Sequence, residues 1–129
     1  MGEATAKLFA SEGALVAAID VDEEGLDRVV AEISSEGKSA KGWILDLSDG
    51  EAIKRVFDEI ADHFGGIDIL VNNAGISIPS PIDDDNYESN WSRSMDILIT
   101  AQTKTSRASL PYIRKSDNPS IVNIASTEG

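Results

Sequence analysis

Short apolar runs alternate with helical stretches along the whole of this 129-residue chain. We expect strands over residues 14–19, 41–45, 67–71 and 120–125, and helices over residues 4–12, 23–36, 51–64 and 87–113. A short continuous apolar run is typical of a strand buried on both faces, and strands that alternate with helices form parallel sheets. The sequence therefore predicts an α/β fold, a doubly wound parallel sheet with helices on both faces.

The helical stretches carry apolar stripes at helical spacing. The second and third helices carry Leu26, Val29, Val30 and Ile33, and then Ile53, Val56, Phe57 and Ile60. In the first helix we expect Ala4, Leu8 and Phe9 to be the apolar positions. Asp22 and Ser48 precede the second and third helices and are predicted to be their N-caps.

Composition excludes several classes of protein. A net charge of −12 argues against nucleic-acid binding, because a phosphate backbone would be repelled. The chain has no cysteine, no visible signal peptide and no apolar run near the ~20 residues that span a bilayer. We therefore expect one cytoplasmic domain over residues 1–129 that binds no membrane. The acidic run Asp83, Asp84 and Asp85 has no accompanying metal-ligand spacing, so we predict a solvated loop and no metal site.

Distinctive polar residues follow the apolar runs, where the strands of a parallel sheet end. They are Asp20, Asp46, Asn72, Asn73 and Ser126. In open parallel sheets, ligands bind at the carboxyl ends of the strands. The segment Asn72-Asn73-Ala74-Gly75 is the most specific of these signals, since small residues let backbone approach a flat ligand and carboxamides can tie neighbouring strand ends together.

These features resemble the short-chain dehydrogenase/reductase family over the whole length of the chain. The Asn-Asn-Ala-Gly segment matches a family motif, and residues 121–126 resemble the strand that delivers the family's active-site serine, here Ser126. Asp46 and Leu47 match the acidic pair that contacts adenine, and Gly2 matches the last glycine of the family's glycine-rich loop. The resemblance implies a Rossmann-like domain that transfers hydride between NAD and a small carbonyl or secondary alcohol.

The resemblance also implies a set of site residues. Ser126 is the catalytic residue within the chain, where it would orient the substrate oxygen. The residues that would bind the cofactor are Gly2, Asp20, Asp46, Leu47, Asn72, Ala74 and Gly75. Relatives often pair through the long helix that corresponds to residues 87–113, so a homo-oligomer through this helix is expected.

Asp20 predicts which dinucleotide is preferred. A carboxylate at that strand end can accept hydrogen bonds from the adenosine ribose hydroxyls, and it would repel a 2′-phosphate. Residues 21–24 contain no lysine or arginine that could bind that phosphate. The sequence therefore favours NAD over NADP.

Three departures from the family pattern shape our expectations. The family's first strand and most of its glycine-rich loop would precede Gly2, and its Tyr-x-x-x-Lys pair would follow Gly129, so we expect the chain to be an incomplete domain with doubtful activity. Leu98 stands where relatives carry a catalytic asparagine. In the family's strand order the first strand lies between the strands at 14–19 and 67–71. Without it we predict either a gap or direct contact between these two strands.

Two other classes of function stay open. The chain could be a non-catalytic nucleotide-binding module or an inactive truncated product. More remotely, Asp20, Asp22 and Asp46 could form the acidic pocket of a receiver-like phosphoacceptor domain, which has a similar length and a parallel sheet.

Overall fold

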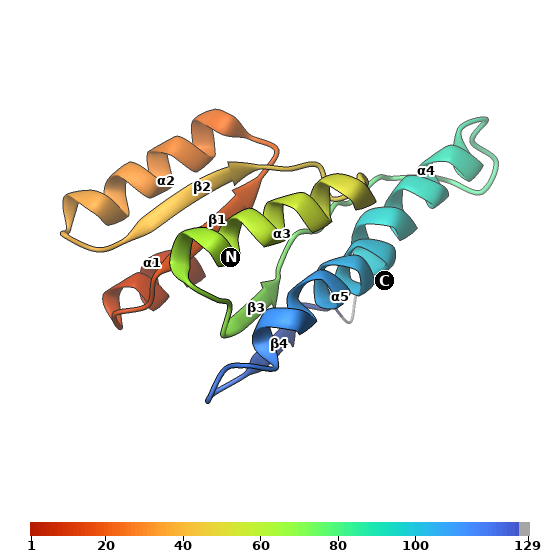
Figure 1. The fold of residues 1–129 in the computed structure, drawn as a ribbon. Helices are drawn as coiled ribbons and strands as arrows, with labels where there is room; N and C mark the ends of the chain where they lie inside the picture. Colours follow the sequence, from red (N-terminus) through yellow and green to blue (C-terminus); the bar gives the residue numbers. More distant parts are fainter. Residues whose placement is uncertain (127–129) are drawn as a thin grey trace.

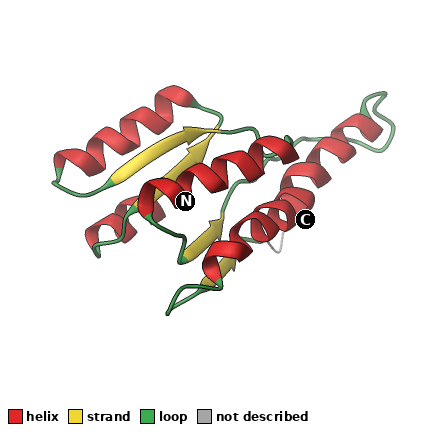
Figure 2. Ribbon diagram, in the orientation of Figure 1, coloured by secondary structure: helices red, strands yellow, loops and turns green. Residues whose placement is uncertain are grey.

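The computed structural model describes residues 1–126 as an α/β arrangement (Figures 1 and 2). In chain order the elements are α1 (Gly2–Ser11), β1 (Val16–Asp20), α2 (Glu23–Ser35), β2 (Ala40–Ile44), α3 (Gly50–Phe64), β3 (Ile69–Asn72), α4 (Tyr87–Met95), the π-helical turn η1 (Asp96–Thr100), α5 (Ala101–Ile113) and β4 (Ser120–Asn123). The predicted strands and helices are all present, and α4, η1 and α5 follow one another without a break in place of the single long helix.

The strands form two separate parallel pairs. β1 pairs with β2 from Val16 opposite Ala40 to Asp20 opposite Ile44. β3 pairs with β4 from Ile69 opposite Ser120 to Asn72 opposite Asn123. β1 and β3 do not pair with each other, so of the two predicted alternatives, a gap or direct contact, the structure shows the gap.

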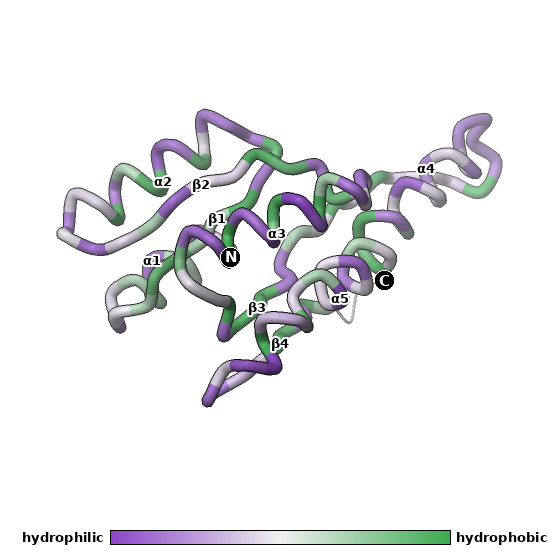
Figure 3. Tube along the Cα trace, in the orientation of Figure 1, coloured by the Kyte–Doolittle hydropathy of each residue, from purple (hydrophilic) through white to green (hydrophobic). Residues whose placement is uncertain are grey.

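Helix α3 connects the two strand pairs through the largest apolar cluster. Its apolar stripe is buried, with Ile53 only 1% exposed. The cluster draws residues from every layer around α3: Ala17 and Ile19 of β1, Trp43 of β2, Leu70 of β3 and Ala108 of α5. Figure 3 shows hydrophobic and hydrophilic residues alternating along α3, as expected for a helix with one apolar face.

A second apolar cluster joins α1 and α2 to the other face of β1 and β2. It contains Ala10, Val16, Val29, Ile33 and, at its edge, Ala6, Phe9 and Ala40. The predicted stripe of α1 is therefore partly wrong, since Leu8 is 58% exposed and Ala4 is also exposed. Positions 6, 9 and 10 share the helix face that meets β1, and residues 4 and 8 lie on the outer side.

Ion pairs fasten α1 to α2. Arg28 of α2 donates to both carboxylate oxygens of Glu3, at 3.1 and 2.7 Å, and Lys7 of α1 pairs with Glu32. Hydrogen bonds from Arg28 and Lys7 lower the pKa of Glu3 to about 2. All four side chains are solvent-exposed, so these pairs fix the position of α1 more than they stabilise the fold.

Coverage of the sheet differs between its two halves. Both faces of β1 and β2 are packed against helices, as a doubly wound sheet requires. In β4, however, all four residues are exposed, and Ile69 of β3 is 46% exposed. The expectation of strands buried on both faces is thus wrong for β3 and β4 in the described residues, because helices cover only one face there. No described helix is long and apolar enough to cross a membrane.

The helix ends follow local chemistry, with one correction. Asp22 caps α2 as predicted, since its side chain accepts a hydrogen bond from the Gly25 N–H at 3.2 Å. Asp49, and not Ser48, caps α3, where its Oδ1 accepts from the N–H groups of Glu51 and Ala52 at 3.1 and 3.0 Å. The helix begins at Gly50, so the residue before it is the N-cap.

Replacing the true cap should weaken α3 measurably. We expect Asp49→Ala to lower the free energy of unfolding by about 1 kcal/mol, because two amides at the start of α3 lose their acceptor. Ser48→Ala is the matched control and should change it by less than about 0.5 kcal/mol. Urea denaturation of the three proteins measures both values, and equal losses would restore Ser48 as the cap.

Candidate functional site

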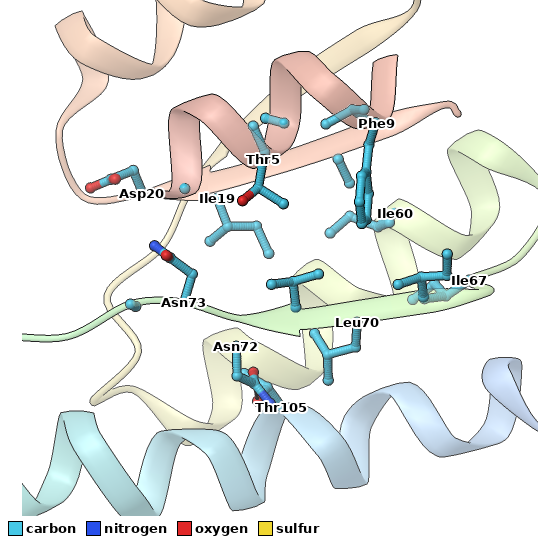
Figure 4. Close-up of a pocket in the computed structure, with 18 of the residues that line it drawn as sticks. Thr5, Phe9, Ile19, Asp20, Ile60, Ile67, Leu70, Asn72, Asn73 and Thr105 are labelled. Atoms are coloured by element: carbon cyan, nitrogen blue, oxygen red, sulfur yellow. Dashed lines mark hydrogen bonds between the residues drawn. The ribbon is translucent and has the colours of Figure 1, made fainter. Parts of the chain in front are cut away.

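A cavity of about 770 Å³ separates β1 from β3. Figure 4 shows that Asp20 and Asn73 lie at the same end of it, where both strands end, with Thr5 and Phe9 of α1 along one side. Of the predicted site residues, those that line the cavity are Gly2, Asp20, Leu47, Asn72 and Ala74. Asp46, Gly75 and Ser126 are not among its lining residues.

Gly2 and Asn73 meet at the start of α1. A Cβ added to Gly2 would lie 2.7 Å from Nδ2 of Asn73, so the end of the Asn73 side chain would have to shift. The absence of a Cβ at Gly2 lets the Asn73 side chain lie against the start of α1 as it does here. The arrangement brings the unpaired N–H groups of a helix N-terminus next to the end of β3, which is a setting suited to anionic ligands.

Asn72 holds the carboxyl end of β3 in place. Its Nδ2 donates to Oδ1 of Asn123 at 2.8 Å, which ties β3 to β4. Its Oδ1 accepts from the Thr105 hydroxyl at 2.7 Å, which ties β3 to α5. Because Asn72 and Thr105 are both buried, these bonds form away from water and leave the side chain no freedom to turn toward a ligand. Asn72 therefore positions the turn that follows it.

Asp20 lies exposed at the end of β1. Its Oδ1 accepts from the backbone N–H groups of Val21 and Asp22, at 2.7 and 3.1 Å. These bonds hold the carboxylate in a fixed orientation at the mouth of the cavity. Within residues 1–126 both bonds end on Oδ1, which leaves Oδ2 to accept from a bound hydroxyl group.

Asp46 and Leu47 follow β2. Oδ1 of Asp46 accepts from the Ser48 N–H at 2.9 Å. This bond, followed by one from the Ser48 hydroxyl and by the charge of Arg93, lowers the pKa of the Asp46 carboxyl. Asp46 is therefore a charged acceptor at neutral pH. Leu47 is half-buried and packs against the cluster around α3, so it gives this turn an apolar wall.

Gly75 lies beside the π-helical turn. A Cβ built on Gly75 would be 3.5 Å from Cδ2 of Leu98, which is an ordinary contact. The turn itself comes from a backbone bond in which the Ala101 N–H donates to the carbonyl of Asp96, five residues earlier. The side chain of Leu98 thus packs against the loop after β3. By the family resemblance, an asparagine was expected at this position.

Ser126 and Tyr112 lie in different parts of the molecule. Ser126 is exposed and follows β4, at the edge of the sheet where Asn72 and Asn123 meet. Tyr112 lines a smaller hollow with Gly66 and Asp68, near the opposite end of β3. Its hydroxyl donates to Oδ1 of Asp58 at 2.6 Å, and this bond raises the pKa of Tyr112. A raised pKa and a distant position both argue against an acid/base role for Tyr112.

Two contacts of the site were not predicted from the sequence. Thr105 is a hydrogen-bond partner of Asn72, and no local pattern marks it, because it lies 33 residues away in an amphipathic helix. Asn73 belongs to the motif, but its contact with Gly2 depends on how α1 docks.

The described residues contain no group of three His, Cys, Asp or Glu side chains that could hold a metal ion. Asp20, Asp22 and Asp46, which the receiver-like alternative would place in one acidic pocket, each accept hydrogen bonds from nearby backbone N–H groups.

Comparisons with known proteins show what this chain is similar to. A sequence model described as short chain dehydrogenase matches residues 1–129. The 3-oxoacyl-acyl-carrier-protein reductase of Thermotoga maritima is 34% identical over 129 residues, which are 100% of this chain and 52% of that protein. The meso-2,3-butanediol dehydrogenase of Serratia marcescens is also 34% identical, over 100% of this chain and 50% of its own length.

Solved structures match as well. A short chain dehydrogenase from Mycobacterium smegmatis has a TM-score of 0.87 at 29% identity, covering 96% of this chain and 52% of that one. A metagenomic short-chain oxidoreductase in complex with NADP also has a TM-score of 0.87 at 29% identity, covering 98% of this chain and 57% of that one. The chain spans about half the length of the curated relatives it matches. It belongs to the short-chain dehydrogenase family.

Proposed function

We propose that residues 1–129 form part of an NAD-binding Rossmann domain of a short-chain oxidoreductase. One observation carries the proposal: Gly2, Asp20 and Asn73 border a single cavity at the carboxyl ends of β1 and β3. The N-terminus of α1 suits the diphosphate of an adenosine diphosphate group. The Asp20 carboxylate, which can accept hydrogen bonds from hydroxyl groups, suits its ribose.

Each predicted residue has a distinct part in this proposal. Asp20 would accept from a ribose hydroxyl through Oδ2. Asp46, which is charged at neutral pH, would accept from the adenine amino group, and Leu47 would contact the ring. Asn72 would act indirectly, by fixing the Ala74 and Gly75 backbone against the cofactor.

The proposed preference is for NAD over NADP, although one similar structure holds NADP. Val21 is 64% exposed beside Asp20, and neither it nor the next three residues carry a positive charge. Among the described residues, Arg28 is the one cationic residue that lines the cavity, and its guanidinium is paired with Glu3. A 2′-phosphate would thus meet a carboxylate without a counter-ion.

The proposed chemistry is exchange of a hydride between a small carbonyl or secondary alcohol and the nicotinamide, which the cofactor supplies when bound. Ser126 would donate a hydrogen bond that orients the substrate oxygen. No tyrosine in the chain is followed four residues later by lysine, and Tyr112 is bonded to Asp58. Proton transfer is therefore the step that this chain does not support by itself, and Leu98 cannot hold a water as an asparagine would. The engaged Tyr112 and the leucine at position 98 favour a non-catalytic nucleotide-binding module as the second candidate function.

We also propose assembly of the protein through its long helix. The structure buries no residue of α4. Trp91, Met95 and Ile99 are 55%, 37% and 56% exposed, and their spacing of four residues puts them on one face. Such a stripe suits a contact with the same helix of a second copy.

A cytoplasmic location remains a prediction from the composition.

Cofactor preference should depend on Asp20. In a version extended with a glycine-rich loop before Gly2 and a Tyr-x-x-x-Lys segment after Gly129, we expect Asp20→Ala combined with Val21→Arg to shift the preference from NAD toward NADP by tenfold or more. The reason is that a ribose acceptor is lost and a phosphate partner is gained.

The measurement is kcat/KM with each cofactor. Asp27→Ala is the control, because it removes an exposed carboxylate from α2, outside the cavity lining. If the unmodified extended enzyme already favours NADP, the proposed role of Asp20 is wrong.

The 129-residue chain alone should transfer no measurable hydride. Loss of a general acid/base costs roughly 10²–10⁴-fold in rate. Measuring NADH formation by absorbance with a panel of secondary alcohols checks this. Turnover that disappears in Ser126→Ala would contradict it.

A further inference from the structure

The buried stripe of α5 contains two hydroxyl groups that helix packing alone does not explain. Its members lie four residues apart on one face of the helix: Ala101, Thr105, Ser109 and Ile113. A core-facing stripe is ordinarily apolar, and burying a hydroxyl group is unfavourable unless it has a hydrogen-bond partner. Thr105 is 3% exposed and Ser109 is 0% exposed. The partners of these two hydroxyls therefore indicate what each of them does.

The two hydroxyls have partners of different kinds. The hydroxyl of Ser109 donates to the carbonyl of Ser106, within α5 itself, at 2.9 Å. The hydroxyl of Thr105 has two carbonyls of its own helix within reach, at 2.9 and 3.1 Å, but its shortest bond is to Oδ1 of Asn72, at 2.7 Å. Figure 4 shows these two side chains pointing toward one another. Because helix carbonyls already accept backbone N–H groups, the single hydroxyl proton serves Asn72.

Asn72 extends this contact to β4. Its Nδ2 donates to Oδ1 of Asn123 at 2.8 Å, and its backbone carbonyl accepts from the Ile124 N–H at 2.9 Å. Ser126 lies two residues after Ile124. Through one amide, the Thr105 hydroxyl is thus connected both to the turn after β3 and to the segment that leads to Ser126.

Removing the hydroxyl would act on the strand ends and leave the fold in place. Within residues 1–126, the Thr105 hydroxyl is the donor to Oδ1 of Asn72. Without it, this buried amide oxygen would lack a partner, and the amide would gain one only by turning away from Asn123. β3 and β4 would still pair through their backbones, from Ile69 opposite Ser120 onward.

We propose that Thr105 is a positioning residue of the oxidoreductase reaction: its hydroxyl holds Asn72 so that Ser126 keeps a fixed place relative to the turn that meets the cofactor. This inference rests on the proposed function of the site. Gly2 and Asp20, which would anchor the cofactor, belong to α1 and β1 and lie outside this series of bonds. Loss of the hydroxyl therefore leaves cofactor binding nearly unchanged and misplaces the serine, and a small misplacement near the reacting atoms is costly in rate.

Steady-state kinetics of the extended enzyme described above test the proposal. We expect Thr105→Val, which replaces the hydroxyl with a methyl group, to lower kcat about tenfold and to change the KM for NAD less than about threefold. Thr105→Ser keeps the hydroxyl and should stay within about twofold of the unmodified kcat. Thr105→Ala has the same expectation as Thr105→Val and replaces it if that protein does not fold by circular dichroism.

Two comparisons separate positioning from a general effect of the mutation on the core. Ser109→Ala removes the other buried hydroxyl of the same stripe, whose bond stays within α5, and should change kcat less than about twofold. In an Asn72→Ala background, Thr105→Val should lower kcat by less than a further factor of about two, because the two residues act through one bond.

Hydrogen exchange of the 129-residue chain, measured by NMR, tests the positioning without any turnover. The Ile124 amide donates to Asn72, and the Leu45 amide, which donates to Asp20 in the other strand pair, is the reference. Relative to that reference, Thr105→Val should speed exchange of the Ile124 amide at least about fivefold and Ser109→Ala less than about twofold. If the extended enzyme turns over no NAD, the proposed function fails, and this measurement alone decides whether Thr105 positions the two strand ends.

Four results would overturn the proposal. The first is an unchanged kcat in a folded Thr105→Val enzyme, and the second is an equal fall of kcat in Ser109→Ala. The third is a full, additive loss from Thr105→Val in the Asn72→Ala background. The fourth is unchanged relative exchange of the Ile124 amide in the Thr105→Val chain, since Thr105 would then not hold the ends of β3 and β4 together.

Discussion

The apolar face of α3 is the interaction on which the rest of this structure depends. β1 and β3 share no backbone hydrogen bonds in the described residues, so strand pairing cannot hold the two halves of the molecule together. Instead, one buried helix contacts β1 and β2 on one side and β3 and α5 on the other. Phe57 and Ile60, at 2% and 4% exposure, lie between the halves. Everything at the carboxyl edge, including the relative placement of Asp20 and Asn72, follows from this packing.

The same constraint explains how a site is formed by an open sheet. Parallel strands end at one edge, so Asp20 and Asn73 come together although 53 positions separate them in the sequence. Hydrogen bonds then fix each group: the N–H groups of Val21 and Asp22 orient Asp20, and the hydroxyl of Thr105, from α5, holds Asn72. The edge is therefore ordered by backbone and amide contacts of this chain and needs no ligand to bring its residues together.

Sequence patterns predicted most of the fold because its elements are locally specified. The buried stripe of α3, the Asp22 cap and the apolar run of β1 each follow from spacing within a few residues. The errors lie where tertiary contacts decide. Which face of α1 is buried depends on its docking to β1, which turned Leu8 outward. Likewise, the contact of Gly2 with Asn73 joins segments that no local pattern relates. The exposure of β4 could not be predicted either, since burial of a strand depends on neighbours outside it.

Amide hydrogen exchange of the free chain, resolved residue by residue by NMR, tests most directly whether α3, and not strand pairing, joins the two halves. If β1 and β3 are unpaired edges, exchange rates alternate along each strand. The account predicts that the amides of Ile19 and Val71 exchange at least about tenfold faster than those of Ala18 and Leu70, which point toward β2 and β4. Uniformly slow exchange along both strands would contradict it, because the edges would then be bonded to each other.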